Sequence, residues 1–154
     1  MEMNCIVNGN FEKGYLFPWI SEHAKVIAYD NGLGQYCALL PSNFNSRIYQ
    51  NIPTLSFNKY KLIFCLSSDS VKPIPSLEVA IQYNDIEGKK IDVLNLVTIS
   101  SSKLIKPNKW TIFEKEILAA KFNVISLLLE FKLVGQRLST SNVLIGDVKL
   151  ISTI

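Results

Sequence analysis

The sequence has little of what catalytic and metal sites usually need. Its 154 residues contain a single histidine, His23, and three cysteines without metal-ligand spacing, so neither a zinc site nor a Cys–His pair is indicated. There is no Gly-x-Ser-x-Gly motif and no glycine-rich phosphate loop. His23 is expected to be a solvated loop residue. These absences predict that the protein is not an enzyme.

Long apolar runs, a strong charge of one sign and a leader segment are also missing. No run approaches the roughly 20 apolar residues of a membrane span, so we expect no membrane partner. The net charge is only +3 and the lysines are scattered, so we expect no nucleic-acid partner. The first residues, Met1 to Cys5, lack the basic and apolar regions of a secretory signal. This predicts either a protein that is made in the cytoplasm and stays inside the cell, or one whose leader has been removed.

Short alternating segments separated by Asn, Gly, Pro and Ser clusters fill the chain instead. An apolar fraction of 48% argues against disorder. The pattern predicts one all-β domain over residues 1–154, an antiparallel jelly-roll β-sandwich. Asp30-Asn31-Gly32 and Asn84 to Gly88 are typical of tight hairpin turns. The expected strands are Asn4–Val7, Ala24–Tyr29, Tyr36–Leu40, Arg47–Ile52, Tyr60–Ser68, Ser76–Tyr83, Asp92–Ser100, Trp110–Ile117, Val124–Val134 and Asn142–Ser152.

Alternation within these strands assigns side chains to faces. The residues expected to face the core are Ile125, Leu127, Leu129, Phe131 and Leu133 in one strand, and Leu77, Val79, Ile81 and Tyr83 in another. If the strands adjoin, one polar outer surface carries Arg47, Tyr49, Glu78, Gln82, Glu130 and Lys132.

A sugar ring has one apolar C–H face and a rim of hydroxyls, so it favours an exposed aromatic ring with polar neighbours. Tyr49, flanked by Arg47 and Gln50, is the ring that best fits this description. The candidate glycan-binding residues are therefore Arg47, Tyr49, Glu78, Gln82 and Glu130.

The cysteines are odd in number, which disfavours a closed set of intramolecular disulfides. Cys37 and Cys65 lie within apolar strand segments and are expected to be core thiols. Cys5 lies near a terminus. It is the candidate for a disulfide between subunits.

The two ends of the chain carry related motifs. Val7-Asn8-Gly9-Asn10-Phe11-Glu12 with Pro18-Trp19 opens the chain, and Val143 to Leu150, containing Gly146-Asp147-Val148, closes it. In the opening motif Asn and Gly are turn residues that tolerate positive φ. The pair resembles the first and last strands of galactose-binding-like and carbohydrate-binding-module sandwiches. The resemblance implies that the ends meet and that Trp19 and Trp110 anchor the core.

The same resemblance implies a structural calcium ion where the first and last strands meet. Glu12 and Asp147 match the two acidic positions, and oxygen ligands are what calcium takes. The family often has two consecutive Asp where this chain has Gly146-Asp147. The alternative is that Glu12 caps backbone amides and Asp147 makes a local hydrogen bond.

Over its whole length the chain also resembles the amino-terminal sandwich domain that precedes collagen-like repeats in spore-surface proteins of Bacillus-type bacteria. The matching stretches are Val7 to Gly14, Pro18-Trp19, Arg47 to Pro53, Tyr60 to Leu62, Val79 to Asp85, Trp110-Thr111 and Gly146 to Val148. This resemblance implies deposition on the spore surface from the mother-cell cytoplasm. No Gly-x-y repeat follows, so the chain is either an excised domain or a stand-alone subunit; Met1 favours the latter.

Three functions follow from these observations. The leading hypothesis is a non-enzymatic structural protein that self-assembles into a homo-oligomer or fibre in a spore coat, exosporium or appendage. The alternative is a carbohydrate-binding module that recognises a glycan on one face of the sandwich. The third is a subunit of a parasporal or toxin-like assembly.

Overall fold

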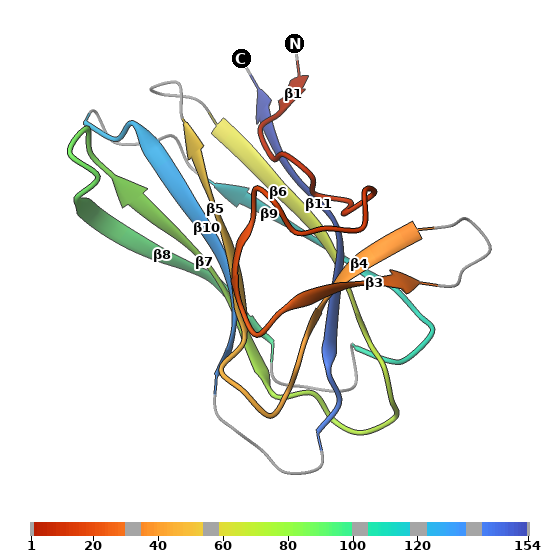
Figure 1. The fold of residues 1–154 in the computed structure, drawn as a ribbon. Coiled ribbons are helices and arrows are strands. Elements are labelled where there is room, and N and C mark those ends of the chain that lie inside the picture. Colours follow the sequence, from red (N-terminus) through yellow and green to blue (C-terminus); the bar gives the residue numbers. More distant parts are fainter. Residues whose placement is uncertain are drawn as a thin grey trace.

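Two antiparallel sheets pack face to face in the computed structural model, which describes residues 2–29, 35–53, 59–99, 105–117, 123–134 and 140–153 (Figure 1). The six-stranded sheet has the order β3 (Lys25–Tyr29), β4 (Gln35–Leu40), β11 (Val143–Thr153), β6 (Lys59–Ser68) and β9 (Thr111–Ile117), with β1 (Glu2–Asn4) also paired to β11. The five-stranded sheet has the order β2 (Ile20–Glu22), β5 (Arg47–Pro53), β10 (Ser126–Val134), β7 (Ser76–Asn84) and β8 (Lys90–Ile99). No helix occurs among the described residues, so the predicted all-β sandwich is confirmed.

Most strands follow the predicted segments to within two or three residues. The hairpin turn after Asn84 is confirmed: Gly88 has a φ of 76°, and its N–H donates to the Asp85 carbonyl at 3.0 Å. β1 occupies Glu2–Asn4 rather than Asn4–Val7, and β2 was not predicted because three residues are too few to show alternation. The predicted turn at Asp30-Asn31-Gly32 lies outside the described residues.

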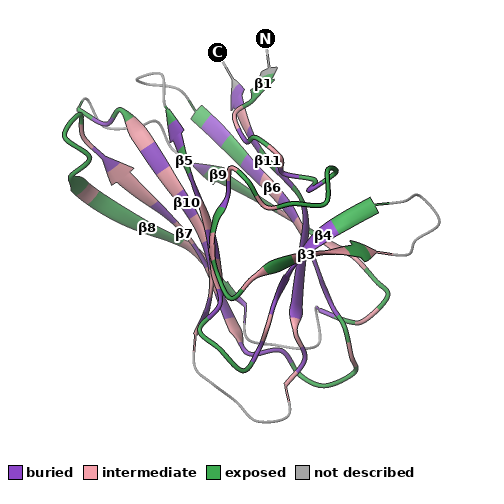
Figure 2. Ribbon diagram, viewed as in Figure 1, coloured by how far each residue is buried: buried purple, intermediate pink, exposed green. Residues whose placement is uncertain are grey.

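Alternation fixes the core largely as predicted. Leu127, Leu129 and Phe131 on β10 have no exposed area, and buried and partly exposed residues alternate along this strand in Figure 2. The prediction was wrong for Ile125, which is 44% exposed because it precedes the first residue of β10. Tyr83 lies only half-buried beside the core.

Aromatic side chains join the two sheets at the centre of the sandwich. Phe64 of β6 meets Phe131 of β10 edge to face, with ring centroids 5.2 Å apart. Trp19 also contacts Phe131 edge-on, at 6.2 Å, and lies 6.0 Å from Phe11. Pairs of this geometry each add about 0.5–1.5 kcal/mol beyond the burial of their area. Trp19 is 4% exposed, so its predicted role as a core anchor is confirmed.

The two ends of the chain meet, as predicted. β1 pairs with β11, and N and C lie side by side in Figure 1. Beyond β1 the contact continues: Cys5 N–H donates to the Leu150 carbonyl at 2.8 Å, and Val148 N–H donates to the Gly9 carbonyl at 2.9 Å. Asn8, at a φ of 55°, adopts the predicted positive φ, and its carbonyl accepts the indole N–H of Trp19 at 3.0 Å.

Gly9 is required where the opening loop crosses β11. A Cβ atom built on Gly9 would overlap the carbonyl oxygen of Val148, a backbone atom that cannot turn aside. We therefore expect Gly9→Ala to lower the free energy of unfolding by about 3 kcal/mol, as overpacking does. Urea denaturation of the variant and the natural protein measures this difference.

Gly88→Ala is the matched control. Gly88 has a positive φ but no atom within 4 Å of an added Cβ, so this substitution costs only the backbone strain of about 1 kcal/mol. If Gly9→Ala and Gly88→Ala lower the free energy of unfolding equally, steric contact with Val148 does not contribute to the effect at Gly9.

Candidate functional site

The outer face of the five-stranded sheet brings the predicted polar residues together. Glu130 on the central strand β10 lies opposite Tyr49 of β5 on one side and Ala80 of β7 on the other. Lys132, two residues further along β10, lies between Arg47 and Glu78 in the same way. The expectation that these strands adjoin and share one polar surface is therefore confirmed.

Arg47 is held in place on this face by three neighbours. Its Nη1 donates to Glu130 Oε2 at 2.8 Å, and its Nη2 lies 3.4 Å from Glu22 Oε1. The guanidinium carbon lies 4.5 Å from the centroid of the Tyr49 ring, a cation–π contact. One face of Tyr49 is thus covered by Arg47, a contact that the sequence pattern did not predict.

A shallow hollow of about 190 Å³ opens between these side chains, and we call it the Arg47 hollow. Its lining residues are Arg47, Tyr49, Ala80, Gln82, Val93, Leu128 and Glu130. Ala80 has a small side chain and pairs with Glu130 of β10 on one side and with Asn95 of β8 on the other. Gln82 Nε2 donates to Asn84 Oδ1 at 2.8 Å, which fixes its amide. Glu78 shares the face but does not line the hollow.

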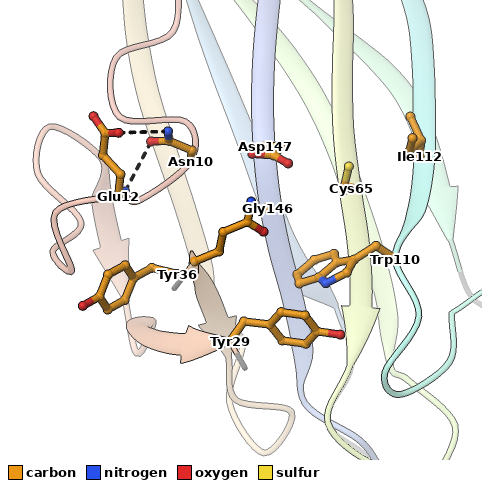
Figure 3. Close-up of a pocket in the computed structure, with 10 residues that line it drawn as sticks. Asn10, Glu12, Tyr29, Tyr36, Cys65, Trp110, Ile112, Gly146 and Asp147 are labelled. Carbon is orange, nitrogen blue, oxygen red and sulfur yellow. Dashed lines mark hydrogen bonds between the residues drawn. The ribbon is translucent and has the colours of Figure 1, made fainter. Parts of the chain in front are cut away.

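A larger hollow of about 520 Å³ lies on the outer face of the six-stranded sheet, and we call it the Trp110 hollow (Figure 3). Its lining residues are Asn10, Glu12, Tyr29, Gln35, Tyr36, Cys65, Trp110, Ile112, Gly146 and Asp147. A second apolar cluster lies on this face: Cys37, Leu39 and Leu144, with Ile27, Tyr29 and Trp110 packed against them. These strand residues alternate with core residues such as Ala38 and Ile145. The sheet is therefore apolar on both sides here.

Trp110 belongs to this outer cluster, so the prediction that it anchors the core was wrong. Its ring packs over Gly146, where an added Cβ would lie 3.3 Å from the ring atom Cζ3. Tyr29 meets it edge to face, with centroids 5.0 Å apart and an interplanar angle of 77°. Gly146 therefore leaves room for this indole beside the sheet.

Glu12 and Asp147 both line the Trp110 hollow. The Glu12 carboxylate accepts from Asn10 Nδ2 at 3.4 Å, and the Asn10 side-chain carbonyl accepts from the Glu12 backbone N–H at 3.2 Å. In Figure 3, Asn10 lies between Glu12 and Asp147. Asp147 is exposed, with a φ of 47°, in the bulge between Gly146 and Lys149.

Calcium takes six to eight oxygen ligands. No group of three or more His, Cys, Asp or Glu side chains among the described residues could hold a metal ion. The nearby carbonyls of Asn8 and Gly9 already accept hydrogen bonds from Trp19 and Val148. A structural calcium ion held by Glu12 and Asp147 therefore stays a prediction.

The three cysteines are free thiols in different surroundings. Cys37 is fully buried, as expected, although in the second cluster, and burial raises the pKa of its thiol to about 12. Cys65 is half-buried and lines the Trp110 hollow, so the prediction of a core thiol was wrong. Burial raises the pKa of Cys65 most, the charge of Asp147 adds to this, and Lys149 opposes it.

Cys5 is half-buried beside the core, with its Sγ 3.8 Å from the Met3 carbonyl oxygen. Burial raises the pKa of this thiol, against a smaller opposing effect of a backbone hydrogen bond from Ser152. A disulfide between subunits through Cys5 stays a prediction.

No family model and no curated protein sequence matches the chain. Solved structures do. The enzymatically active domain of tailspike protein 4 from Bacteriophage CBA120 matches with a TM-score of 0.72 and 12% identity, over 97% of this chain and 21% of that chain. TmCBM61, solved in complex with beta-1,4-galactotriose, matches with a TM-score of 0.65 and 17% identity, over 98% of this chain and 99% of that chain. The CBM22-1 xylan-binding domain of Xyn10C from Paenibacillus barcinonensis matches with a TM-score of 0.68 and 11% identity, over 94% and 91%.

At these identities the similarity establishes the fold alone. The chain shares a jelly-roll-like β-sandwich with carbohydrate-binding modules and spans nearly all of the two named here, but only about a fifth of the tailspike chain. The predicted resemblance to carbohydrate-binding-module sandwiches is therefore confirmed at the level of the fold. The resemblance to spore-surface proteins gains no support from these structures and stays a prediction. The described residues form no helix long and apolar enough to cross a membrane.

The thiol environments predict an order of chemical reactivity. A raised pKa keeps a cysteine protonated at neutral pH, and the thiolate is the reactive species. We expect Cys37 to resist alkylation by iodoacetamide in the folded protein, and Cys5 and Cys65 to react slowly at neutral pH and faster as the pH rises. Mass spectrometry of digested samples measures each site, with urea-unfolded protein as the control. Rapid alkylation of Cys37 in the folded protein would contradict the assigned burial.

Proposed function

We propose that the protein is a non-catalytic carbohydrate-binding module that binds a glycan across the outer face of the five-stranded sheet. The observation that carries the proposal is the Arg47 hollow: polar side chains from β5, β10 and β7 converge there on a sandwich whose fold is that of carbohydrate-binding modules. Glycan binding was the alternative reading of the sequence. It now takes precedence over self-assembly.

The chemistry of the Arg47 hollow suits sugar hydroxyls. Arg47 supplies N–H donors in a position fixed by Glu130 and Glu22, so little side-chain entropy is lost on binding. Glu130 and Gln82 supply acceptors, and Gln82 is itself fixed by Asn84. The uncovered part of the Tyr49 ring offers a contact for the apolar face of a sugar. The hollow is shallow, so a chain can cross it without being enclosed.

Catalysis is not part of the proposal. Hydrolysis of a glycosidic bond needs two carboxyl groups, one on each side of the bond. Glu130 is the carboxylate that lines the Arg47 hollow, and it is committed to Arg47 at 2.8 Å. We expect no release of reducing ends when the protein is incubated with a polysaccharide that it binds.

Self-assembly on a spore surface stays a hypothesis that rests on the sequence resemblance. It predicts oligomers or fibres whose size depends on protein concentration. Sedimentation velocity with and without reductant distinguishes this from a monomeric binding module. A concentration-dependent assembly that binds no glycan would reverse the ranking of the two functions.

Removing the Tyr49 ring tests the binding site. Tyr49→Ala removes both the sugar contact and the support for Arg47, so we expect binding to fall about tenfold or more, equivalent to about 1.4 kcal/mol. Affinity electrophoresis in gels containing soluble xylan or galactan measures the loss. Glu130→Gln removes the charge that pairs with Arg47 and one acceptor oxygen, and should weaken binding without changing the fold.

Tyr15→Ala is the matched control, because Tyr15 is another exposed tyrosine, 47% accessible, in the opening loop. It should retain the mobility shift of the natural protein. If Tyr49→Ala and Tyr15→Ala migrate alike, the face around Arg47 does not bind the polysaccharide.

A further inference from the structure

The proposed glycan site leaves the Trp110 hollow unused. This hollow lies on the opposite sheet, and its volume of about 520 Å³ is within the range of about 300–1,000 Å³ that small-ligand sites occupy. It also differs in chemistry from the Arg47 hollow, because three aromatic residues, Tyr29, Tyr36 and Trp110, line it.

Trp110 and Tyr29 form the aromatic wall. Their rings meet at 77°, and in Figure 3 the Tyr29 side chain reaches toward Trp110. Gly146 lies beneath the indole and holds it close to the sheet, while Trp110 itself is only half-buried. Ile112, 66% exposed, extends the apolar surface along β9. The exposed part of the Trp110 indole suits the C–H face of a sugar ring.

Asn10, Glu12 and Asp147 form the polar rim. The two carboxylates accept hydrogen bonds from hydroxyl groups, and Asn10 has both a donor and an acceptor. Among the described residues that line the Trp110 hollow, none is a lysine or an arginine. The rim therefore carries two carboxylates, whose negative charge is partly offset by Lys149 near Cys65 and disfavours anionic ligands.

We propose that the Trp110 hollow is a second carbohydrate-binding site, which takes a neutral sugar ring stacked on Trp110 with its hydroxyls toward Asp147 and Asn10. The inference rests on the proposed function for the class of ligand only, because the two sites lie on opposite sheets and share no residue. A protein with both sites holds two glycan segments at once. It then gains avidity on an insoluble polysaccharide.

Nuclear magnetic resonance mapping of the full chain tests the second site. Labelled protein is titrated separately with β-1,4-galactotriose, with xylohexaose and with the acidic trisaccharide trigalacturonic acid. We expect at least one neutral sugar to shift the backbone amides of Ile112, Gly146 and Asp147. We expect the acidic sugar to bind there about tenfold more weakly, equivalent to about 1.4 kcal/mol.

Trp110→Phe and Tyr49→Ala separate the two sites. Trp110→Phe keeps an aromatic ring in the second cluster and should weaken binding at Gly146 about tenfold, while shifts at Tyr49 and Glu130 stay the same. Tyr49→Ala should do the reverse. If sugar shifts Ile112, Gly146 and Asp147 of the natural protein but not Tyr49 and Glu130, the proposed function is overturned and the second site stands.

Three results would overturn the second site. The first is that neither neutral sugar shifts the amides of Ile112, Gly146 and Asp147. The second is that those shifts are unchanged in Trp110→Phe. The third is that trigalacturonic acid binds there as well as the neutral sugars, which would refute the assigned class of ligand. Because a misfolded variant could mimic a loss, the tryptophan fluorescence of the natural protein provides an independent readout: half-buried Trp110 should respond to sugar, whereas Trp19 is buried in the core.

Discussion

The close contact between the opening loop and β11 is the constraint on which the rest of the structure depends. Gly9 lies against the Val148 carbonyl, and the Val148 N–H donates back to the Gly9 carbonyl at 2.9 Å. β11 in turn pairs with β1, β4 and β6, so it is the central strand of its sheet. The same contact places the Asn8 carbonyl against the indole N–H of Trp19 and brings Asn10 and Glu12 to the rim of the Trp110 hollow. One steric requirement thus shapes both the core and an outer face.

The two outer faces offer a glycan different chemistry. Around Arg47, four strands supply charged and amide groups that already pair with their neighbours, Arg47 with Glu130 and Glu22 and Gln82 with Asn84, so the surface is rigid and directional. Around Trp110, the sheet carries a second apolar cluster, and its exposed side is aromatic with a negatively charged rim. A rigid polar surface selects a sugar by the positions of its hydroxyl groups. An aromatic surface contacts the C–H face of the sugar ring and depends less on where the hydroxyl groups point. These properties complement each other in one small domain.

Local pattern was sufficient to predict the sandwich and one of its faces. Period-two alternation identifies Leu127, Leu129 and Phe131 as core, and strand adjacency then brings Arg47 and Glu130 together. Side-chain contacts that depend on tertiary packing could not be predicted from the alternation of apolar and polar residues. The position of Arg47 over Tyr49 arises from the ion pairs with Glu130 and Glu22, which belong to other strands.

The Trp110 hollow was missed because its residues come from segments far apart in the chain. The apolar strand segment of Cys65 predicts that this residue lies in the core, and the family resemblance implies the same for Trp110, but the six-stranded sheet is apolar on both faces at this point. The signal that could have revealed it is the Gly146-Asp147 departure from the family motif, since a glycine under an indole makes room for that ring.

The most direct test of the account is a crystal structure of the protein with the neutral glycan that binds most tightly on an array of plant and bacterial polysaccharide fragments. The account predicts sugar density against Tyr49, with hydroxyls within hydrogen-bonding distance of Arg47 and Glu130. An array on which no glycan binds, or a complex with sugar on neither outer face of the sandwich, would contradict it.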